Sequence, residues 1–360
     1  MRWGSLSEIP GGFGPSAVTI GNFDGVHRGH QAVLARVVAR ARERDLHAVA
    51  VTFDPHPSAV HRPRGAVPSI VAPWQRLDLM EDAGLDAVLT VPYTQDFARM
   101  NPEDFARRYL AVALGASLVV VGRDLRFGHA NSGDLGVLTA LGASLGFQVE
   151  AVEDLGDTDA EGPDQGGAVD APTGSGPHLR VDLDGVAGRP RWSSTAVRHL
   201  LADGDVEEAS RVLGRLHRVV GQVVRGDARG RSLGFPTANL SADCSGMMPA
   251  DGVYAGWVTR LDLPPGSADK VLPAAVSVGT NPTFARPPGA SPSASAPSAI
   301  RRIEAHVPGR TDLDLYGETV AVDFVVRLRS TLAFTTVDAL TAQMHDDVSG
   351  AMVALRARRN

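Results

Sequence analysis

The sequence predicts an α/β domain with a parallel sheet, followed by a small β-barrel or sandwich that ends in a helix. Strand and helix patterns alternate up to about residue 215, which is typical of a parallel sheet covered by helices. From about residue 216, short β-rich runs separated by Gly and Pro replace the helical pattern. The 360 residues also exceed the length of one ordinary domain. We therefore expect domains at 1–215 and 216–360.

Apolar runs and amphipathic stretches define the elements of the first domain. Strands are expected at Ala17–Phe23, Leu46–Phe53, Ala87–Val91, Ser117–Gly122 and Gln148–Val152. Helices are expected at Gly29–Arg44, near Asn101–Leu114 and at Leu135–Leu145. Residues 156–178 are rich in Gly, Asp and Pro, which predicts a flexible insertion. After it, we expect Ser194 or Thr195 to cap a short helix that runs through Ala202 and is stopped by Gly204. Asp205 and Glu208 resemble a capping pair for a second helix, which ends at Gly214.

The second domain shows strand patterns separated by turn residues. They lie at Val219–Val224, Gly252–Thr259, Ala274–Val278, Arg302–Val307 and Glu318–Val326. An amphipathic helix is expected at about Thr336–Leu355, at the end of the chain. Residues 287–299 form a Pro/Ser/Ala tract, which predicts a flexible insertion inside this domain.

Composition narrows the class of protein. The net charge of −6 argues against a nucleic acid or an anionic membrane as partner. One cysteine, Cys244, excludes an intramolecular disulfide, and we expect a cytoplasmic protein because no apolar run resembles a signal peptide or a membrane span. A homo-oligomer is compatible with the sequence. Lys270 is the only lysine, so a Walker A loop is absent and nucleotide chemistry would need another phosphate anchor.

The stretch GNFDGVHRGH at residues 21–30 stands where the first strand leads into the first helix. In a parallel sheet this is a ligand-binding position. From these residues alone it could be a solvated turn, a metal site or a phosphate site. Zinc lacks a third ligand at suitable spacing. Glycines and a helix N-terminus suit phosphate, and His27 and His30 can donate hydrogen bonds to phosphoryl oxygens, so we favour the phosphate site.

GNFDGVHRGH resembles the HxGH signature of the nucleotidylyltransferase superfamily. With its GNFDG start it is similar to the FMN adenylyltransferase half of bacterial bifunctional riboflavin kinase/FAD synthetases. Three further stretches agree in order: TFDPHP at 52–57, VGRDLRFGHANSGD at 121–134 and SSTAVR at 193–198.

The second half resembles the riboflavin kinase domain of the same proteins. The similar stretches are GDARGRSLGFPTANL at 226–240, DGVYAGWV at 251–258, SVGTNPTF at 277–284, IEAH at 303–306 and DLYG at 314–317. The resemblance implies a Rossmann-like HxGH domain followed by an antiparallel β-barrel with a C-terminal helix. The two low-complexity tracts fall between the motifs.

For the adenylyltransferase, the resemblance implies that His27 and His30 contact the ATP phosphates, with Asn22 and Asp24 lining the same site. Ser194, Thr195 and Arg198 would meet the phosphates from the opposite side, although SSTAVR alone reads equally as a capped helix. Phe127 is a candidate to stack on the isoalloxazine, and core packing is the alternative.

For the kinase, the resemblance implies that Glu304 is the base for the riboflavin 5′-hydroxyl; without it, Glu304 reads as a solvated strand residue. Thr237 and Asn239 offer hard oxygen ligands for Mg²⁺ with ATP; without the resemblance they read as turn residues. The loop from Gly226 to Gly234 would cover the nucleotide; its candidate ATP-binding residues are Gly226, Arg229, Gly230, Arg231 and Gly234.

The expected activity is therefore phosphorylation of riboflavin to FMN and adenylylation of FMN to FAD, with riboflavin, FMN and ATP as small-molecule substrates. A flavin-binding protein that has lost an activity is the main alternative. An adenylyltransferase for another acceptor, or a fragment of an aminoacyl-tRNA synthetase, fits less well with the negative charge and the attached barrel.

Overall fold

The computed structural model describes residues 1–153, 192–226, 230, 233–280, 301–310 and 312–358. The predicted insertions at 156–178 and 287–299 lie outside the described residues. By their contacts, residues 1–153 and 192–194 form a first unit, and the described residues from 195 onward form a barrel unit. No helix within these described ranges is long and apolar enough to cross a membrane.

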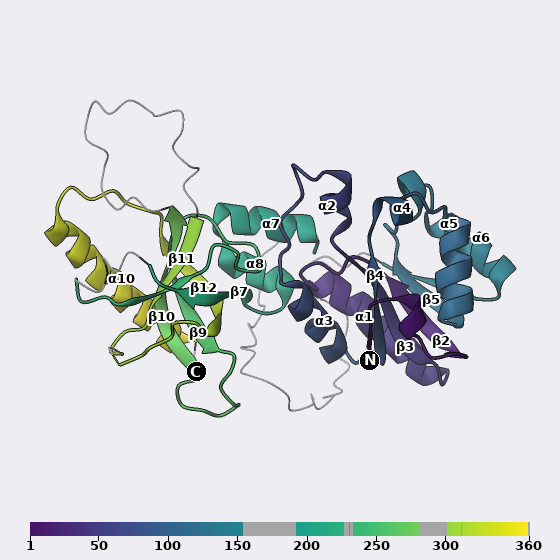
Figure 1. The fold of residues 1–360 in the computed structure, drawn as a ribbon, viewed down its shortest axis with the longest axis horizontal. Helices are drawn as coiled ribbons and strands as arrows, with labels where there is room; N and C mark the ends of the chain where they lie inside the picture. Colours follow the sequence, from purple (N-terminus) through teal and green to yellow (C-terminus); the bar gives the residue numbers. More distant parts are fainter. Residues whose placement is uncertain (154–191, 227–229, 231–232, 281–300, 311, 359–360) are drawn as a thin grey trace. The chain divides into compact units, whose positions relative to one another are not determined.

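The first unit is built on a parallel sheet with the strand order β1-β4-β3-β2-β5-β6 (Figure 1). Its strands are β1 Arg2–Trp3, β2 Ser16–Ile20, β3 His47–Asp54, β4 Ala87–Pro92, β5 Ala116–Gly122 and β6 Gln148–Val152. The chain moves from β2 to β3 and β4 on one side, and then returns to place β5 on the other side of β2. The carboxyl ends of β2 and β5 therefore flank a topological switch point, where open α/β sheets bind ligands.

Helices cover both faces of this sheet, as Figure 1 shows. α1 Arg28–Glu43 and α3 Pro73–Asp82 bury Leu34, Val37 and Met80 against one face. α5 Pro102–Phe105, the π-helix η2 Ala106–Ala113 and α6 Leu135–Leu145 cover the other. Short elements complete the unit: η1 Leu6–Glu8, α2 Pro57–His61, α4 Gln95–Ala98 and η3 His129–Asn131. Strand residues of alternating orientation fill the two cores, which confirms the predicted α/β class.

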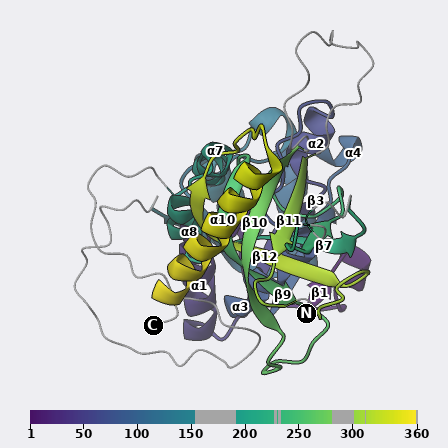
Figure 2. The ribbon, with the colours of Figure 1, turned by 90° about the vertical axis from the view of Figure 1, so that its left-hand side faces the viewer.

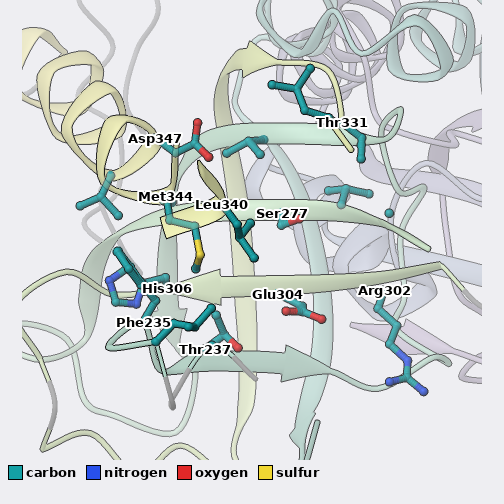
Figure 3. Close-up of a pocket in the computed structure, with 18 of the residues that line it drawn as sticks. Phe235, Thr237, Ser277, Arg302, Glu304, His306, Thr331, Leu340, Met344 and Asp347 are labelled. Atoms are coloured by element: carbon teal, nitrogen blue, oxygen red, sulfur yellow. The ribbon is translucent and has the colours of Figure 1, made fainter. Parts of the chain in front are cut away.

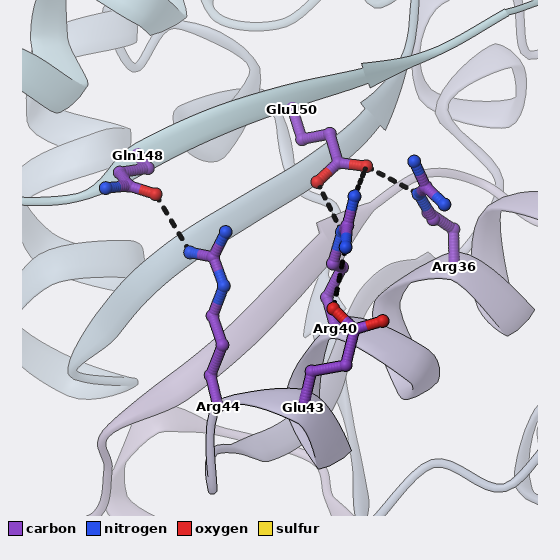
Figure 4. Close-up of polar contacts among 6 residues, drawn as sticks. All are labelled: Arg36, Arg40, Glu43, Arg44, Gln148 and Glu150. Atoms are coloured by element: carbon purple, nitrogen blue, oxygen red, sulfur yellow. Dashed lines mark hydrogen bonds and ion pairs between the residues drawn. The ribbon is translucent and has the colours of Figure 1, made fainter.

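Edge strand β6 is tied to helix α1 by ion pairs (Figure 4). Glu150 accepts from Arg36 and Arg40, with 2.8 Å between its Oε2 and Arg40 Nε, and Arg44 donates to the Gln148 side chain. Desolvation raises the pKa of Glu150, but the hydrogen bonds from Arg40 and Arg36 outweigh it and lower the pKa. These basic residues of α1 therefore serve packing inside the unit.

The barrel unit is a closed antiparallel barrel with the order β10-β11-β8-β7-β12-β9. Its strands are β7 His217–Val224, β8 Thr237–Leu240, β9 Gly252–Arg260, β10 Val271–Thr280, β11 Arg301–His306 and β12 Thr319–Arg329. Helix α10 Val337–Ala357 lies across the strands, as Figure 2 shows, and packs on Ala255, Trp257 and Val325 through Ala351 and Leu355. The barrel, rather than a sandwich, is confirmed.

Two helices precede the barrel in the chain. α7 Ser194–Asp203 and α8 Val206–Leu213 match the predicted pair, and Asp205 caps α8 by accepting from the Glu208 amide at 3.0 Å. From Thr195 onward the contacts group them with the barrel unit. The predicted boundary between residues 215 and 216 places them with the first domain and stays a prediction.

His217 lies at the start of β7, fully buried, with its Nε2–H donating to the Met247 carbonyl at 2.7 Å. Burial lowers the pKa of His217 from 6.5 to about 4. In the unfolded chain His217 therefore becomes protonated below about pH 6.5. In the folded barrel it stays neutral down to about pH 4. Stability from this group is present above pH 6.5 and is lost as the pH falls toward 4, by about 3 kcal/mol in total.

We predict that His217→Gln makes the free energy of unfolding less dependent on pH between 6.5 and 4. Urea denaturation of the full chain across this range measures it. The exposed His345 on α10 offers a control in His345→Gln. Equal pH dependence in the parent and His217→Gln would contradict the prediction.

Candidate active sites

The GNFDGVHRGH segment leaves β2 at the switch point, and the RFG loop follows β5 at the same edge of the sheet. Strand β2 ends at Ile20, whereas the sequence predicted a strand that runs to Phe23. Phe23, Gly25 and Val26 then have φ values of 48°, 81° and 41°. A left-handed conformation is unusual for a bulky or β-branched residue and has to be held by its surroundings. Phe23 and Val26 are 2% and 1% exposed, so buried side chains hold this turn in place.

His27 and His30 lie together at the N-terminus of α1. Their rings stack with 3.7 Å between centroids, and the Phe23 ring packs edge-on to His30. His27 caps the helix, since its Nδ1 accepts from the His30 amide at 3.4 Å. That contact leaves Nε2 as the N–H donor of His27. An imidazole donor at the positive end of a helix is suited to an anionic oxygen.

Asp24 belongs to this turn, and Ser194 is hydrogen-bonded to it. The buried Asp24 carboxylate accepts from the Ile70 amide at 3.0 and 3.2 Å, and the Ser194 hydroxyl donates to the Asp24 carbonyl at 2.8 Å. In the structure the Asp24 side chain fixes the backbone at Ile70, and the Ser194 side chain fixes the backbone at Asp24. That these two residues and Asn22 line one ATP site stays a prediction.

Arg76 of α3 is a residue that sequence reasoning missed. Its guanidinium donates to the Asn22 carbonyl at 3.1 Å and to the Phe53 carbonyl at 3.0 Å. An arginine on the face of an amphipathic helix normally points to solvent, so local sequence offers no signal for this role.

Thr195 and Arg198 lie on α7, where the contacts group them with the barrel unit. Their predicted approach to the ATP phosphates stays a prediction. Phe127 is 8% exposed, packs against Phe105 with 5.9 Å between ring centroids, and belongs to the core of the first unit. The described packing favours the core alternative, and stacking of Phe127 on a flavin also stays a prediction.

The barrel unit contains a cavity of about 220 Å³ between its strands and α10 (Figure 3). Leu340 and Met344 of α10 line one side, and Thr237, Ser277 and Glu304 come from three strands. The wall thus combines apolar side chains with a few convergent polar groups, as small-molecule sites do.

Strand register explains why the predicted kinase residues meet. In the antiparallel ladder Glu304 lies opposite Asn239 on one side and Ser277 on the other, and His306 lies opposite Thr237. Residues two apart share a face, so Thr237 and Asn239 of β8 point to the same side as Glu304 and His306. All four line the cavity.

The described residues of the loop before β8 include close contacts with these groups. Gly226 has no room for a side chain, because a Cβ there would lie 2.6 Å from the Asn239 amide atoms. Gly230 accepts from the amides of Leu233 and Phe235, and Gly234 has a φ of 86°. Phe235 packs edge-on against His306 and His345. Arg229 and Arg231 lie outside the described residues.

The cavity is also lined by an ion pair that sequence reasoning missed. Arg329 of β12 donates to Asp347 of α10 from Nε at 2.7 Å and from a terminal nitrogen at 2.6 Å. Asp347 is 8% exposed and also accepts from Gln343. This bidentate pair holds α10 over the strands.

Comparison with known proteins separates the two halves of the chain. A family model for FAD synthetase matches residues 13–162, and one for riboflavin kinase matches residues 213–355. The bifunctional riboflavin kinase/FMN adenylyltransferase of Escherichia coli strain K12 is 32% identical over 92% of this chain and 90% of its own length.

The chain belongs to the bifunctional riboflavin kinase/FMN adenylyltransferase family.

Two further relatives agree in extent. The enzyme of the same name from Pseudomonas fluorescens is 32% identical over 92% of this chain and 91% of its own. A crystal structure described as a macrolide-efflux protein from Streptococcus pneumoniae shares 27% identity with a TM-score of 0.74 over 98% of both chains. That description concerns the other protein, and the two family models decide the family here. The family and the fold class predicted from the motifs are confirmed.

We predict that Gly29→Ala lowers adenylyl transfer about 10-fold or more, because catalysis is sensitive to small misplacements. A Cβ at Gly29 would lie 3.0 Å from the Trp192 carbonyl and 3.2 Å from the His27 ring, so the ring has to move. FAD formation from FMN and ATP measures it. Gly136→Ala on α6 is the matched control, since its Cβ meets ordinary contacts at 3.4 Å. Activity within twofold of the parent would refute the prediction.

We predict that Gly226→Ala lowers riboflavin phosphorylation by about 10-fold, because the added methyl displaces the buried Asn239 amide. FMN formation is the measurement, and FAD formation from supplied FMN shows whether the first unit stays intact. Gly350→Ala on α10, whose Cβ contacts begin at 3.8 Å, should leave both activities unchanged. Unchanged FMN formation in Gly226→Ala would count against this role of the glycine.

Proposed function

We propose that this chain makes FAD from riboflavin in two steps: the barrel unit phosphorylates riboflavin to FMN, and the first unit adenylylates FMN. The observation that carries the proposal is that each family model covers a cluster of motif residues in one unit. The FAD synthetase model covers the His27–His30 turn at the switch point, and the riboflavin kinase model covers the Glu304 cavity.

In the kinase step, the riboflavin 5′-oxygen attacks the γ-phosphorus of ATP, and ADP leaves. The hydroxyl proton passes to Glu304, which stands on the cavity wall opposite Asn239. Thr237 and Asn239 fit Mg²⁺ by their chemistry, since a hydroxyl and an amide oxygen two residues apart are hard donors. Bound with ATP, Mg²⁺ would neutralise charge on the phosphates. The apolar side chains of Leu340 and Met344 suit the isoalloxazine ring.

In the adenylyl-transfer step, a phosphate oxygen of FMN attacks the α-phosphorus of ATP, and pyrophosphate leaves. The nucleophile is already anionic, so positioning and stabilisation of charge on the leaving group carry the rate. His27 and His30 donate hydrogen bonds to the ATP phosphates, Asn22 and Asp24 shape the turn, and Arg198 adds a permanent charge. We expect these reactions in the cytoplasm, on small-molecule substrates.

The two activities should separate by mutation, because Glu304 and His30 lie in different units. We predict that Glu304→Gln lowers FMN formation by about 100-fold or more while leaving FAD formation from supplied FMN intact, in line with the loss of a general base. His30→Ala should lower FAD formation from supplied FMN and leave FMN formation from riboflavin intact. Chromatography of flavins after incubation with ATP and Mg²⁺ measures both.

Parent protein that forms neither FMN nor FAD would refute the proposed function and favour a flavin-binding protein. A variant that folds but loses both activities would refute the assignment of one site to each unit.

A further inference from the structure

The strongest unexplained feature of the first unit is a buried arginine at its ligand-binding edge. Arg76 is 5% exposed, although it sits on a helix at the surface of the sheet. Burial lowers its pKa, and the nearby carboxylates of Asp54 and Asp24 offset this only in part. A buried charge is destabilising unless hydrogen bonds satisfy it, so the partners of this guanidinium matter.

The guanidinium joins the carboxyl ends of two neighbouring strands. One terminal nitrogen donates to the Asn22 carbonyl, just after β2, and the other to the Phe53 carbonyl in β3. The ladder pairs β2 with β3 only as far as Ile20 and Val51, so these carbonyls lie beyond it. Arg76 therefore continues the connection between the strands where backbone pairing has stopped.

Asn22 is connected to the two histidines through the next residue, Phe23. Phe23 follows it with a φ of 48°, and its ring packs against His30. Thr52 Oγ1 donates to the same Asn22 carbonyl at 3.2 Å. A shift of this carbonyl would move the turn that orients the His27–His30 pair.

The same stretch of chain holds the turn a second time. Ile70, which precedes α3, donates its amide to Asp24, and a Cβ at Gly25 would lie 3.0 Å from the Ile70 side chain. Within the segment from Ile70 to Arg76, Ile70 thus contacts Asp24 and Gly25, and Arg76 contacts Asn22. Such over-determination is what a left-handed turn of non-glycine residues requires.

We propose that Arg76 is a positioning residue for adenylyl transfer: its two-pronged hydrogen bonds to Asn22 and Phe53 hold the turn that presents His27 and His30 to ATP. This inference rests on the proposed function of the first unit. Arg76 acts through the turn, and its planar fork is the property that matters, since an ammonium group cannot reach both carbonyls with the same geometry.

The test compares Arg76→Lys and Arg76→Ala in the full-length chain. Both should lower kcat for FAD formation from FMN at least about 10-fold, with riboflavin phosphorylation within twofold of the parent. Methylguanidinium added to Arg76→Ala should restore part of kcat, and methylammonium should not. Chemical rescue by a matching fork would not be expected if Arg76 only stabilised the fold.

Arg42 offers a matched control in the same unit. It also makes a bidentate pair, with Asp86, but that pair holds the Ala48 amide near the start of β3, away from the carboxyl ends. Arg42→Ala should therefore leave kcat for adenylyl transfer unchanged, with the melting temperature reporting any loss of stability.

Three outcomes would overturn the inference. Arg76→Lys with kcat within twofold of the parent overturns the inference, as does folded Arg76→Ala that methylguanidinium fails to rescue. An equal fall of kcat in Arg42→Ala would show a general effect of destabilisation and overturn it too. If Arg76→Ala does not fold, Arg76→Lys decides alone. A parent that makes no FAD at all would instead refute the proposed function.

Discussion

The turn that follows β2 in the first unit depends on how backbone carbonyls are hydrogen-bonded where the parallel strands β2 and β3 separate. Beyond Ile20 the ladder between β2 and β3 stops, and the chain must turn sharply into α1. Arg76 and Thr52 supply donors to the Asn22 carbonyl there, and Asp24 accepts from Ile70. Buried polar groups have to be paired. Meeting that requirement holds the left-handed turn and, through it, the stacked histidines.

In the barrel unit, strand register rather than a turn positions the polar side chains that line the cavity. Because side chains alternate along a strand, a single antiparallel register sets which face each residue occupies. Asn239, Glu304 and Ser277 stand in one row across β8, β11 and β10. Slipping β11 by one residue would turn Glu304 toward the barrel core and Ile303 toward the cavity. α10 forms one wall of the cavity and is held to β12 by the Arg329–Asp347 pair.

Local signals predicted much of the fold. α6 and β6 match their expected bounds, and the caps of α8 at Asp205 and Gly214 are those that the sequence indicates. Other elements escaped notice for physical reasons. β8 is only four residues long and reads as a turn, since its sequence TANL lacks a run of alternating apolar residues. α3 begins with proline after a loop, and its buried Gln75 and Arg76 weaken the apolar pattern of an amphipathic helix.

By itself, the sequence determined the α/β-then-barrel class and the motifs of the family. Periodicity, caps and motif spacing act over a few residues and survive in a linear reading. Only the tertiary structure decided which distant groups serve them. Arg76 reaches Asn22 from 54 positions away, and Arg329 meets Asp347 from another element. Burial and long-range hydrogen bonding select such partners, because their free energy arises only once the chain has packed and excluded water.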